Sequence, residues 1–180
     1  MLIHNAFDPS EVVYNFPGET LIGADFRGLN LDEADFSSMN LTGARFDGAS
    51  LKEVNFGSAI LKEACFDEAE LAETQFFRAD LEGATFRRVK APVSNFGKAN
   101  LRSADFTDAE IEASNFDGVD AGLAKFIRAK FGTSILGHAK FAGADLTDAD
   151  LSKVDEGDLL DIDFSGAVLK GTVLEKRGGK

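Results

Sequence analysis

Large apolar side chains recur at every fifth residue of the chain, from Phe16 to Leu151. Of these twenty-eight positions, fourteen are Phe, eleven are Leu, one is Ile and two are Ala. The residue two positions earlier is usually small, most often Ala. A period of five fits neither the 3.6 residues of a helical turn nor the two-residue alternation of a long strand. The pattern therefore predicts short extended segments separated by turns, with the small and the large residue of each unit facing a common interior.

A second period of twenty residues groups these segments into coils with four sides. One interior column then holds small hydroxyl residues, namely Thr74, Ser94, Ser114 and Ser134. Phe occupies every tenth residue, so two stacks of Phe rings are expected on opposite inner sides of the coils. The predicted structural core comprises Phe26, Phe36, Phe46, Phe56, Phe66, Phe76, Phe86, Phe96, Phe106, Phe116 and Phe126.

The outward positions are mostly polar or glycine, and glycine suits tight corners that need a positive φ. One outer column is expected to stack its polar side chains from coil to coil. Its members are Asn15, Asp35, Asn55, Gln75, Asn95 and Asn115.

Tandem copies of A-(D/N)-(L/F)-x-x occur throughout, among them Ala24-Asp25-Phe26, Ala79-Asp80-Leu81 and Ala104-Asp105-Phe106. On these residues the chain resembles the pentapeptide-repeat family. The resemblance implies an all-β fold, a right-handed quadrilateral parallel β-helix, which the length of this chain would extend to about eight coils. The handedness comes from the resemblance, whereas the four-sided coil follows from the two periods.

The repeat register divides the chain into five segments. Residues 1–15, whose apolar side chains include Ile3 and Phe7, are expected to form an N-terminal cap, because an open coil end exposes unpaired backbone groups and apolar side chains. Residues 16–153 form the repeat β-helix, and 154–158 break its register. Residues 159–174 resume it as one final coil, and 175–180 are a polar tail. Ala91, followed by Pro92, is the weakest unit, and a local distortion is expected there.

Charge narrows the choice of partners. Thirty-one acidic residues against nineteen Lys and Arg give a net charge of −12. This charge argues against direct binding of nucleic acid or of an anionic membrane, and favours another protein with a basic surface. A monomer and an end-to-end dimer both fit the sequence. One cysteine, without an apparent export signal or membrane span, suggests a cytoplasmic protein.

No residue constellation points to catalysis, a cofactor or a metal. His4 and His138 lack partners at metal-binding or triad spacing and are expected on the surface, as is the thiol of Cys65. The acidic run from Asp145 to Asp163 fails the spacing of a calcium-binding loop, so a solvated loop is expected. An interior filled with Phe, Leu and Ala leaves no room for a catalytic cleft, and the protein is predicted not to be an enzyme.

One edge of the predicted coil stands out as a candidate partner-binding surface. Corner residues Glu33, Glu53 and Glu73 recur every twenty residues, and Asp32 and Glu70 lie near them in the repeat. Phe77 is unusual because it occupies an outward position beside Phe76. An exposed aromatic side chain can anchor a partner.

Two functions remain open. The first is a non-enzymatic scaffold that binds another protein through its acidic faces. The second follows from the resemblance, because the family includes proteins that imitate duplex DNA and bind type II topoisomerases such as DNA gyrase, protecting them from quinolones. About 38 Å of duplex, the length of eight stacked coils, carries about twenty-two phosphate charges. A net charge of −12 allows only partial mimicry, so the scaffold ranks first.

Overall fold

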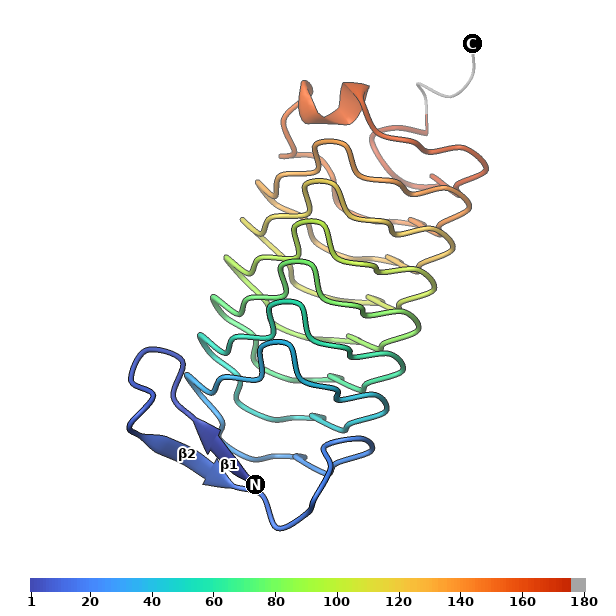
Figure 1. The fold of residues 1–180 in the computed structure, drawn as a ribbon. Coiled ribbons are helices and arrows are strands. Elements are labelled where there is room, and N and C mark those ends of the chain that lie inside the picture. The colour runs from blue at the N-terminus through green and yellow to red at the C-terminus, as the bar shows by residue number, and fades with distance from the viewer. Residues whose placement is uncertain (176–180) are drawn as a thin grey trace.

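Outward residues of the repeat pair with the residue twenty positions later. Asp25 pairs with Arg45, and Asp120 pairs with Lys140, each through a parallel β-bridge. The computed structural model, which describes residues 1–175, stacks these four-sided coils into a rod (Figure 1). The chain is a quadrilateral parallel β-helix, and both periods read from the sequence are confirmed.

The interior contains two continuous stacks of Phe rings. One runs from Phe26 to Phe126, with near-parallel neighbouring rings whose centroids lie 4.5 to 5.0 Å apart. The other runs from Phe36 to Phe116 at 4.8 to 5.2 Å. The two stacks meet edge to face, as Phe66 does with Phe76 at 5.6 Å. All eleven predicted core Phe side chains are fully buried, so the rings fill the space between the walls.

The small hydroxyl residues of the interior column satisfy backbone groups there. Ser114 is buried, and its hydroxyl donates to the carbonyl oxygen of Ala91 at 2.7 Å. The same hydroxyl oxygen accepts a hydrogen bond from the backbone N–H of Ser94 at 3.0 Å. These bonds pair polar groups that would otherwise be buried without partners.

The Asp or Asn before each large residue has a local structural role. The side-chain oxygen of Asn40 accepts the backbone N–H of Thr42 at 3.1 Å, and Asp105 does the same for Thr107 at 3.0 Å. Such bonds satisfy an N–H group at the start of a corner, as in an Asx-turn. The predicted amide ladder is shorter than expected. Among the column's members in the described chain, amide-to-amide hydrogen bonds join Asn115 to Asn95 and Asn95 to Gln75. Asn15 lies outside that column, in a strand of the cap.

The second residue after most of the large ones turns the corner with a positive φ. Glycine fills many of these corners, but eighteen positive-φ residues within 1–175 are not glycine. Among them are Glu53 at 59° and the β-branched Val93 at 60°. Side chains other than glycine adopt this conformation at an energetic cost, so the corners store backbone strain.

An antiparallel hairpin covers the N-terminal end of the rod (Figure 1). Strand β1 (Leu2–His4) pairs with β2 (Val12–Asn15), and β1 also accepts the backbone N–H of Asp35 at the carbonyl of His4. Ile3 in β1 is fully buried and packs into the hydrophobic core. Phe7, which was expected to help close the cap, is 68% exposed instead.

Near the C-terminal end the spacing between paired residues lengthens from twenty to twenty-three, as in the bridge from Lys140 to Asp163. The extra residues form a 3-10 turn, η1 (Asp158–Leu160), because a side of the square coil cannot take three more residues. Leu159 was expected to begin the final coil but lies in this turn. Beyond it, Phe164 stacks on Phe141 with centroids 5.6 Å apart, as the shifted register predicts. Most of the predicted tail, residues 176–180, lies outside the described residues.

The expected distortion at Ala91 is absent, and that prediction was wrong. The N–H of Ala91 donates to the carbonyl oxygen of Glu110 at 2.8 Å, and the N–H of Val93 donates to that of Glu112 at 3.0 Å. Pro92 is tolerated because its position donates no coil-to-coil hydrogen bond, and its fixed φ suits the first residue of a turn.

Candidate partner-binding surface

The structure stacks Glu33, Glu53 and Glu73 at successive corners of the rod. Their φ angles are 62°, 59° and 60°, and all three side chains are exposed. The backbone N–H of each donates to the next coil, as Glu53 does to Ala72 at 2.9 Å. We call these three corners the acidic edge. Like charges held at coil spacing create a negative potential that attracts cations.

Three of the five candidate acids are engaged within the protein. Glu33 accepts a hydrogen bond from the side-chain amide of Asn5 at 3.0 Å. Asp32 accepts the hydroxyl of Ser50 at 2.6 Å, and the carboxylate of Glu70 lies 3.0 Å from the ammonium group of Lys52. These acids have structural partners that a binding partner would have to replace.

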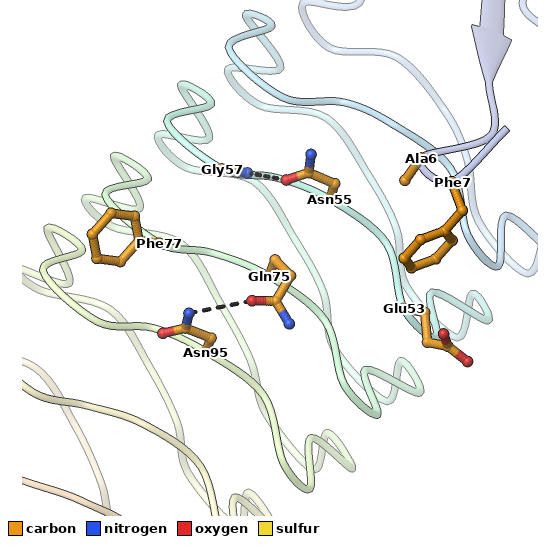
Figure 2. Close-up of a pocket in the computed structure, with 8 residues that line it drawn as sticks. All are labelled: Ala6, Phe7, Glu53, Asn55, Gly57, Gln75, Phe77 and Asn95. Atoms are coloured by element: carbon orange, nitrogen blue, oxygen red, sulfur yellow. Dashed lines mark hydrogen bonds between the residues drawn. The ribbon is translucent and has the colours of Figure 1, made fainter. Parts of the chain in front are cut away.

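The carboxylates of Glu53 and Glu73 are open. Within residues 1–175, no side chain forms an ion pair or hydrogen bond with either of them. They border two adjoining surface hollows, to which Phe7 and Gln75 also contribute. The larger hollow measures about 430 Å³ and is lined in addition by Asn55, Gly57, Phe77 and Asn95, among others (Figure 2).

Phe77 is 37% exposed, as its outward position predicts. Gly97 on the next coil lies beside this ring, and a Cβ there would come within 3.5 Å of a ring carbon of Phe77. The guanidinium carbon of Arg78 lies 5.0 Å from the ring centroid, and the Lys98 ammonium lies 6.0 Å from it. The exposed ring is therefore partly covered by two cations of the protein itself.

Sequence reasoning missed Phe7 as a surface residue, because an apolar residue near a chain end suggests a buried cap. Its outward position follows from hydrogen bonds of Asn5, whose side-chain oxygen accepts the backbone N–H groups of Phe7 at 2.8 Å and Asp8 at 3.1 Å. The pattern Asn-Ala-Phe-Asp could have signalled this turn, since Asn commonly bonds the backbone two residues on.

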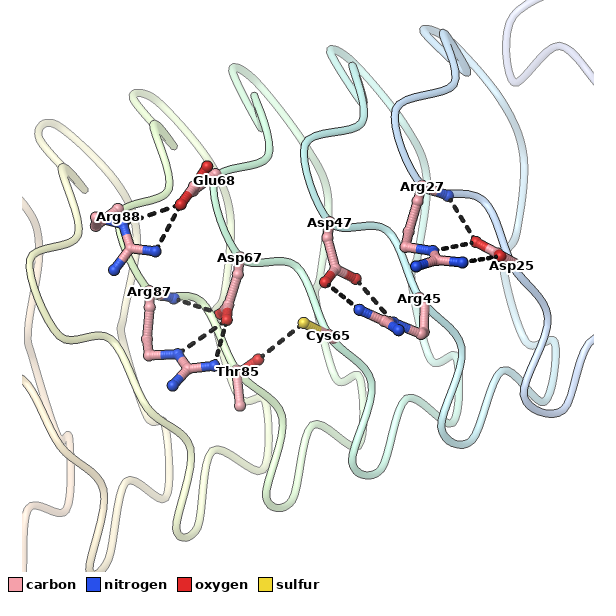
Figure 3. Close-up of polar contacts among 10 residues, drawn as sticks. All are labelled: Asp25, Arg27, Arg45, Asp47, Cys65, Asp67, Glu68, Thr85, Arg87 and Arg88. Atoms are coloured by element: carbon pink, nitrogen blue, oxygen red, sulfur yellow. Dashed lines mark hydrogen bonds and ion pairs between the residues drawn. The ribbon is translucent and has the colours of Figure 1, made fainter.

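A different face of the rod carries paired charges (Figure 3). The carboxylate of Asp67 accepts two side-chain hydrogen bonds from Arg87, one coil later, and Glu68 accepts two from Arg88. Earlier coils pair within one side, as Arg27 does with Asp25 at 2.6 Å. These acids are neutralised locally, so this face does not present an uninterrupted row of negative charges.

The structure does not bring the candidate catalytic and metal-binding residues together. Within the described part of the chain, no group of three or more His, Cys, Asp and Glu is placed to hold a metal. Burial raises the pKa of the Cys65 thiol, with a smaller opposing effect of the hydrogen bond from Thr85, which disfavours the reactive thiolate. His138 is exposed, as expected, whereas His4 is only partly so, and its Nδ1 is buried without a hydrogen-bond partner in the described chain.

Residues Asp145 to Asp163 were predicted to form a solvated loop, but most of them belong to the regular turns of the β-helix. Asp145 and Asp150 accept hydrogen bonds from Thr147 and Ser152, and these bonds lower the pKa of both carboxyl groups. Each bond joins an acid to the residue two positions later within one repeat unit, so these two acids stabilise the local turn. In addition, no helix among residues 1–175 has the length and apolar character needed to span a membrane.

Together these features define a parallel β-solenoid whose interior is filled by side chains and whose distinctive groups lie on the surface. Residues 21–57, 58–90, 94–120 and 124–155 match the family model described as Pentapeptide repeats (8 copies). The protein belongs to the pentapeptide-repeat family, and its β-helix is right-handed. Members of this family are generally non-enzymatic repeat proteins.

Solved structures with this fold include trypsin-treated QnrB1, a plasmid-mediated fluoroquinolone resistance protein. It aligns with a TM-score of 0.73 and 22% identity over 89% of this chain and 92% of that one. A second trypsin-treated QnrB1 variant aligns with a TM-score of 0.66 and 23% identity over 89% of this chain and 96% of that one. A third structure is HetL, a pentapeptide repeat protein involved in heterocyst differentiation regulation from the cyanobacterium Nostoc sp. It aligns with a TM-score of 0.34 and 20% identity over 88% of this chain and 90% of that one. At such identities the likeness to QnrB1 shows the fold alone. No curated protein sequence matches the chain.

Proposed function

We propose that this protein is a non-enzymatic scaffold that binds another protein through its acidic edge. The observation that supports the proposal is the contrast between two kinds of acid on the rod. Most acids are engaged by nearby bases or N–H groups, as Asp67 is by Arg87. The carboxylates of Glu53 and Glu73 are exposed, have no partner in the described chain, and border one hollow together with Phe7. Open carboxylates beside exposed aromatic rings are typical of a surface that meets a basic partner.

The packing supports a binding role over a catalytic one. The Phe stacks fill the interior, and the hollows along the acidic edge are open to solvent. The shifted pKa of Asp67 has a structural cause. Burial raises the pKa of this carboxyl group, but the hydrogen bonds from Arg87 and Thr85, together with the charge of Arg87, outweigh burial and lower it. Such a pair stabilises the fold and needs no catalytic explanation.

Affinity capture with charge-matched baits tests the scaffold. The first bait carries Glu53→Gln and Glu73→Gln, and the control bait carries Glu19→Gln and Glu63→Gln, which are exposed acids away from the acidic edge. We expect a specific protein to be retained by the wild type and the control but lost from the first bait. Equal retention by all three baits would show that the acidic edge is not the binding surface.

A partial DNA mimic that binds DNA gyrase is the second candidate function. It is favoured by the likeness of the fold to QnrB1, a fluoroquinolone resistance protein, together with the acidic surface. The paired charges of Asp67 with Arg87 and Glu68 with Arg88 weigh against it, because a duplex presents unpaired phosphates (Figure 3).

A supercoiling assay with purified gyrase, with and without a quinolone, tests this candidate. Glu53→Gln with Glu73→Gln is the informative variant, since changing Glu33 would also alter its hydrogen bond with Asn5 in the cap. Inhibition or protection by the wild type that weakens in the variant and at higher salt would favour mimicry. No effect at micromolar protein would exclude it in favour of the scaffold.

A further inference from the structure

We infer that the hollow between Phe7 and Phe77 binds one arginine of an extended partner segment that also carries an apolar side chain. This inference rests on the proposed scaffold function and names the chemistry that its site recognises. The hollow measures about 430 Å³ and is bordered by Glu53, and its neighbour of about 380 Å³ is bordered by Glu53 and Glu73. Phe7 and Glu53 line both hollows, and Glu73 lines the second. Figure 2 shows the Phe7 ring beside Glu53 in the first hollow.

The backbone of Phe7 is held in place, and its ring is 68% exposed. Asn5, which is buried, donates to the carboxylates of Glu11 and Glu33, each at 3.0 Å. Its side-chain oxygen accepts the N–H of Phe7, and the N–H of Ala6 donates to the carbonyl of Glu33 at 2.6 Å. The loop is thereby attached to the first corner of the acidic edge, and the ring projects beside the following ones. Because the backbone that carries the ring is already ordered, binding a ligand there costs less loop entropy.

The three corners therefore differ in role. Glu33 attaches the loop that carries Phe7, whereas Glu53 and Glu73 remain available to a ligand. A guanidinium group suits these groups, because it is planar, stacks on an aromatic face and pairs with carboxylates through two parallel hydrogen bonds. An ammonium group lacks the planar fork, so lysine should bind less well.

The rest of the hollow restricts the partner further. Its floor is polar but uncharged, because Asn95 donates to Gln75 at 3.2 Å, and Asn55 accepts the N–H of Gly57 at 3.0 Å. Figure 2 shows these amides between the two exposed rings. Such a floor suits a peptide backbone, which carries both donors and acceptors.

The Phe77 side of the hollow selects an apolar side chain. Arg78 and Lys98 lie beside the Phe77 ring and would repel a second cation there. Side chains two positions apart in an extended peptide point to the same side. The preferred segment is therefore Arg-x-Leu or a similar sequence. An anionic ligand is disfavoured by Glu53 and Glu73, and a purely apolar segment would cover their carboxylates without pairing them.

Titration of labelled peptides tests the inference. The probes are fluorescein-labelled Gly-Ser-Arg-Ser-Leu-Ser-Gly and two matched peptides with lysine or citrulline in place of arginine. They are titrated by fluorescence anisotropy, and by chemical-shift mapping on nitrogen-15-labelled protein. We expect the arginine peptide to bind most tightly and to shift amide signals of Phe7, Glu53 and Asn55. Phe7→Ala, and separately Glu53→Gln with Glu73→Gln, should weaken binding about fivefold or more.

The control variant, Glu19→Gln with Glu63→Gln, removes the same charge and should change the affinity less than about twofold. Melting curves of all variants establish that each is folded. Equal affinity for the three peptides, or equal weakening by both double variants, would overturn the inference in favour of non-specific attraction. If the peptides fail but the Glu53 and Glu73 bait still loses its captured protein, only the arginine site is wrong. If both experiments fail, the scaffold proposal is wrong as well.

Discussion

The guanidinium group of Arg87 donates two hydrogen bonds to the carboxylate of Asp67, one coil earlier on the same face. The Asp67 side chain is only 12% exposed. Arg87→Ala leaves this carboxylate largely buried without its charged partner, so we expect the free energy of unfolding to fall by about 1–3 kcal/mol. Urea denaturation at pH 7 measures the loss.

The adjacent pair provides the control for this prediction. Arg88 bonds Glu68 in the same way, but the Glu68 side chain is 61% exposed. Because exposed ion pairs contribute little, Arg88→Ala should cost less than about 1 kcal/mol. Equal losses in the two variants would mean that burial of the carboxylate does not determine how much the ion pair contributes to the free energy of unfolding.

Acid should destabilise the rod between about pH 4 and pH 2. The hydrogen bond from Arg27 lowers the pKa of Asp25 to about 2, below the usual value of about 3.9 for aspartate. A carboxyl group with a lowered folded pKa stabilises the fold above its unfolded pKa, and this contribution is lost as the pH falls through the folded pKa. Other groups with lowered pKa values act in the same direction, among them Asp67, Asp108, Asp145, Asp150 and Asp163.

Melting temperature recorded as a function of pH tests this effect. We expect a nearly constant value above pH 5 and a decline below pH 4. Asp145→Asn with Asp150→Asn keeps an acceptor for Thr147 and Ser152 but removes two titrating groups, so its decline should be shallower. An identical decline in this variant would show that these two carboxyl groups do not contribute.

The interior of this protein could be predicted from sequence because each core position is fixed by two periods. Phe66 and Phe76 differ by ten residues and so fall on opposite walls, which makes their edge-to-face contact a consequence of the repeat. The same reasoning failed at Ala91, where the small side chain and the following Pro92 suggested a distortion. The backbone hydrogen bonds set the coil, and they do not depend on the size of the side chain.

The candidate site was only partly predictable. The spacing of Glu33, Glu53 and Glu73 indicated a column, but not that Glu33 is occupied by Asn5. The position of Phe7 depends on a hairpin that does not repeat, so no period fixes it. The charge pairs also vary between equivalent positions. Arg27 pairs with Asp25 in its own coil, whereas Arg87 pairs with Asp67 in the preceding coil. Such choices depend on side-chain conformation and neighbouring charges.

The Phe stacks predict a strong contrast between a buried and an exposed Phe. Phe66 is fully buried between Phe46 and Phe86, with ring centroids 4.9 and 4.8 Å away. Phe66→Ala opens a cavity and should cost about 3–5 kcal/mol. Phe77→Ala removes a partly exposed ring and its cation contacts, so it should cost less than about 1 kcal/mol. Comparable losses in denaturant melts would contradict this assignment of inner and outer faces.

Corner strain gives a pair of substitutions with opposite signs. Val93 has a positive φ of 60°, which is unfavourable for a β-branched residue, and its side chain is 57% exposed. Val93→Gly should relieve about 1–2 kcal/mol of backbone strain in the folded protein. Glycine also makes the unfolded chain more flexible, which costs about 1 kcal/mol of stability. The free energy of unfolding should therefore rise by up to about 1 kcal/mol. Gly43 has a φ of 67°, and an added Cβ there meets no atom within 4 Å. Gly43→Val should therefore destabilise the protein through the backbone alone, by about 1 kcal/mol, in the same urea melts. Loss of stability in Val93→Gly would show that the corners are not strained.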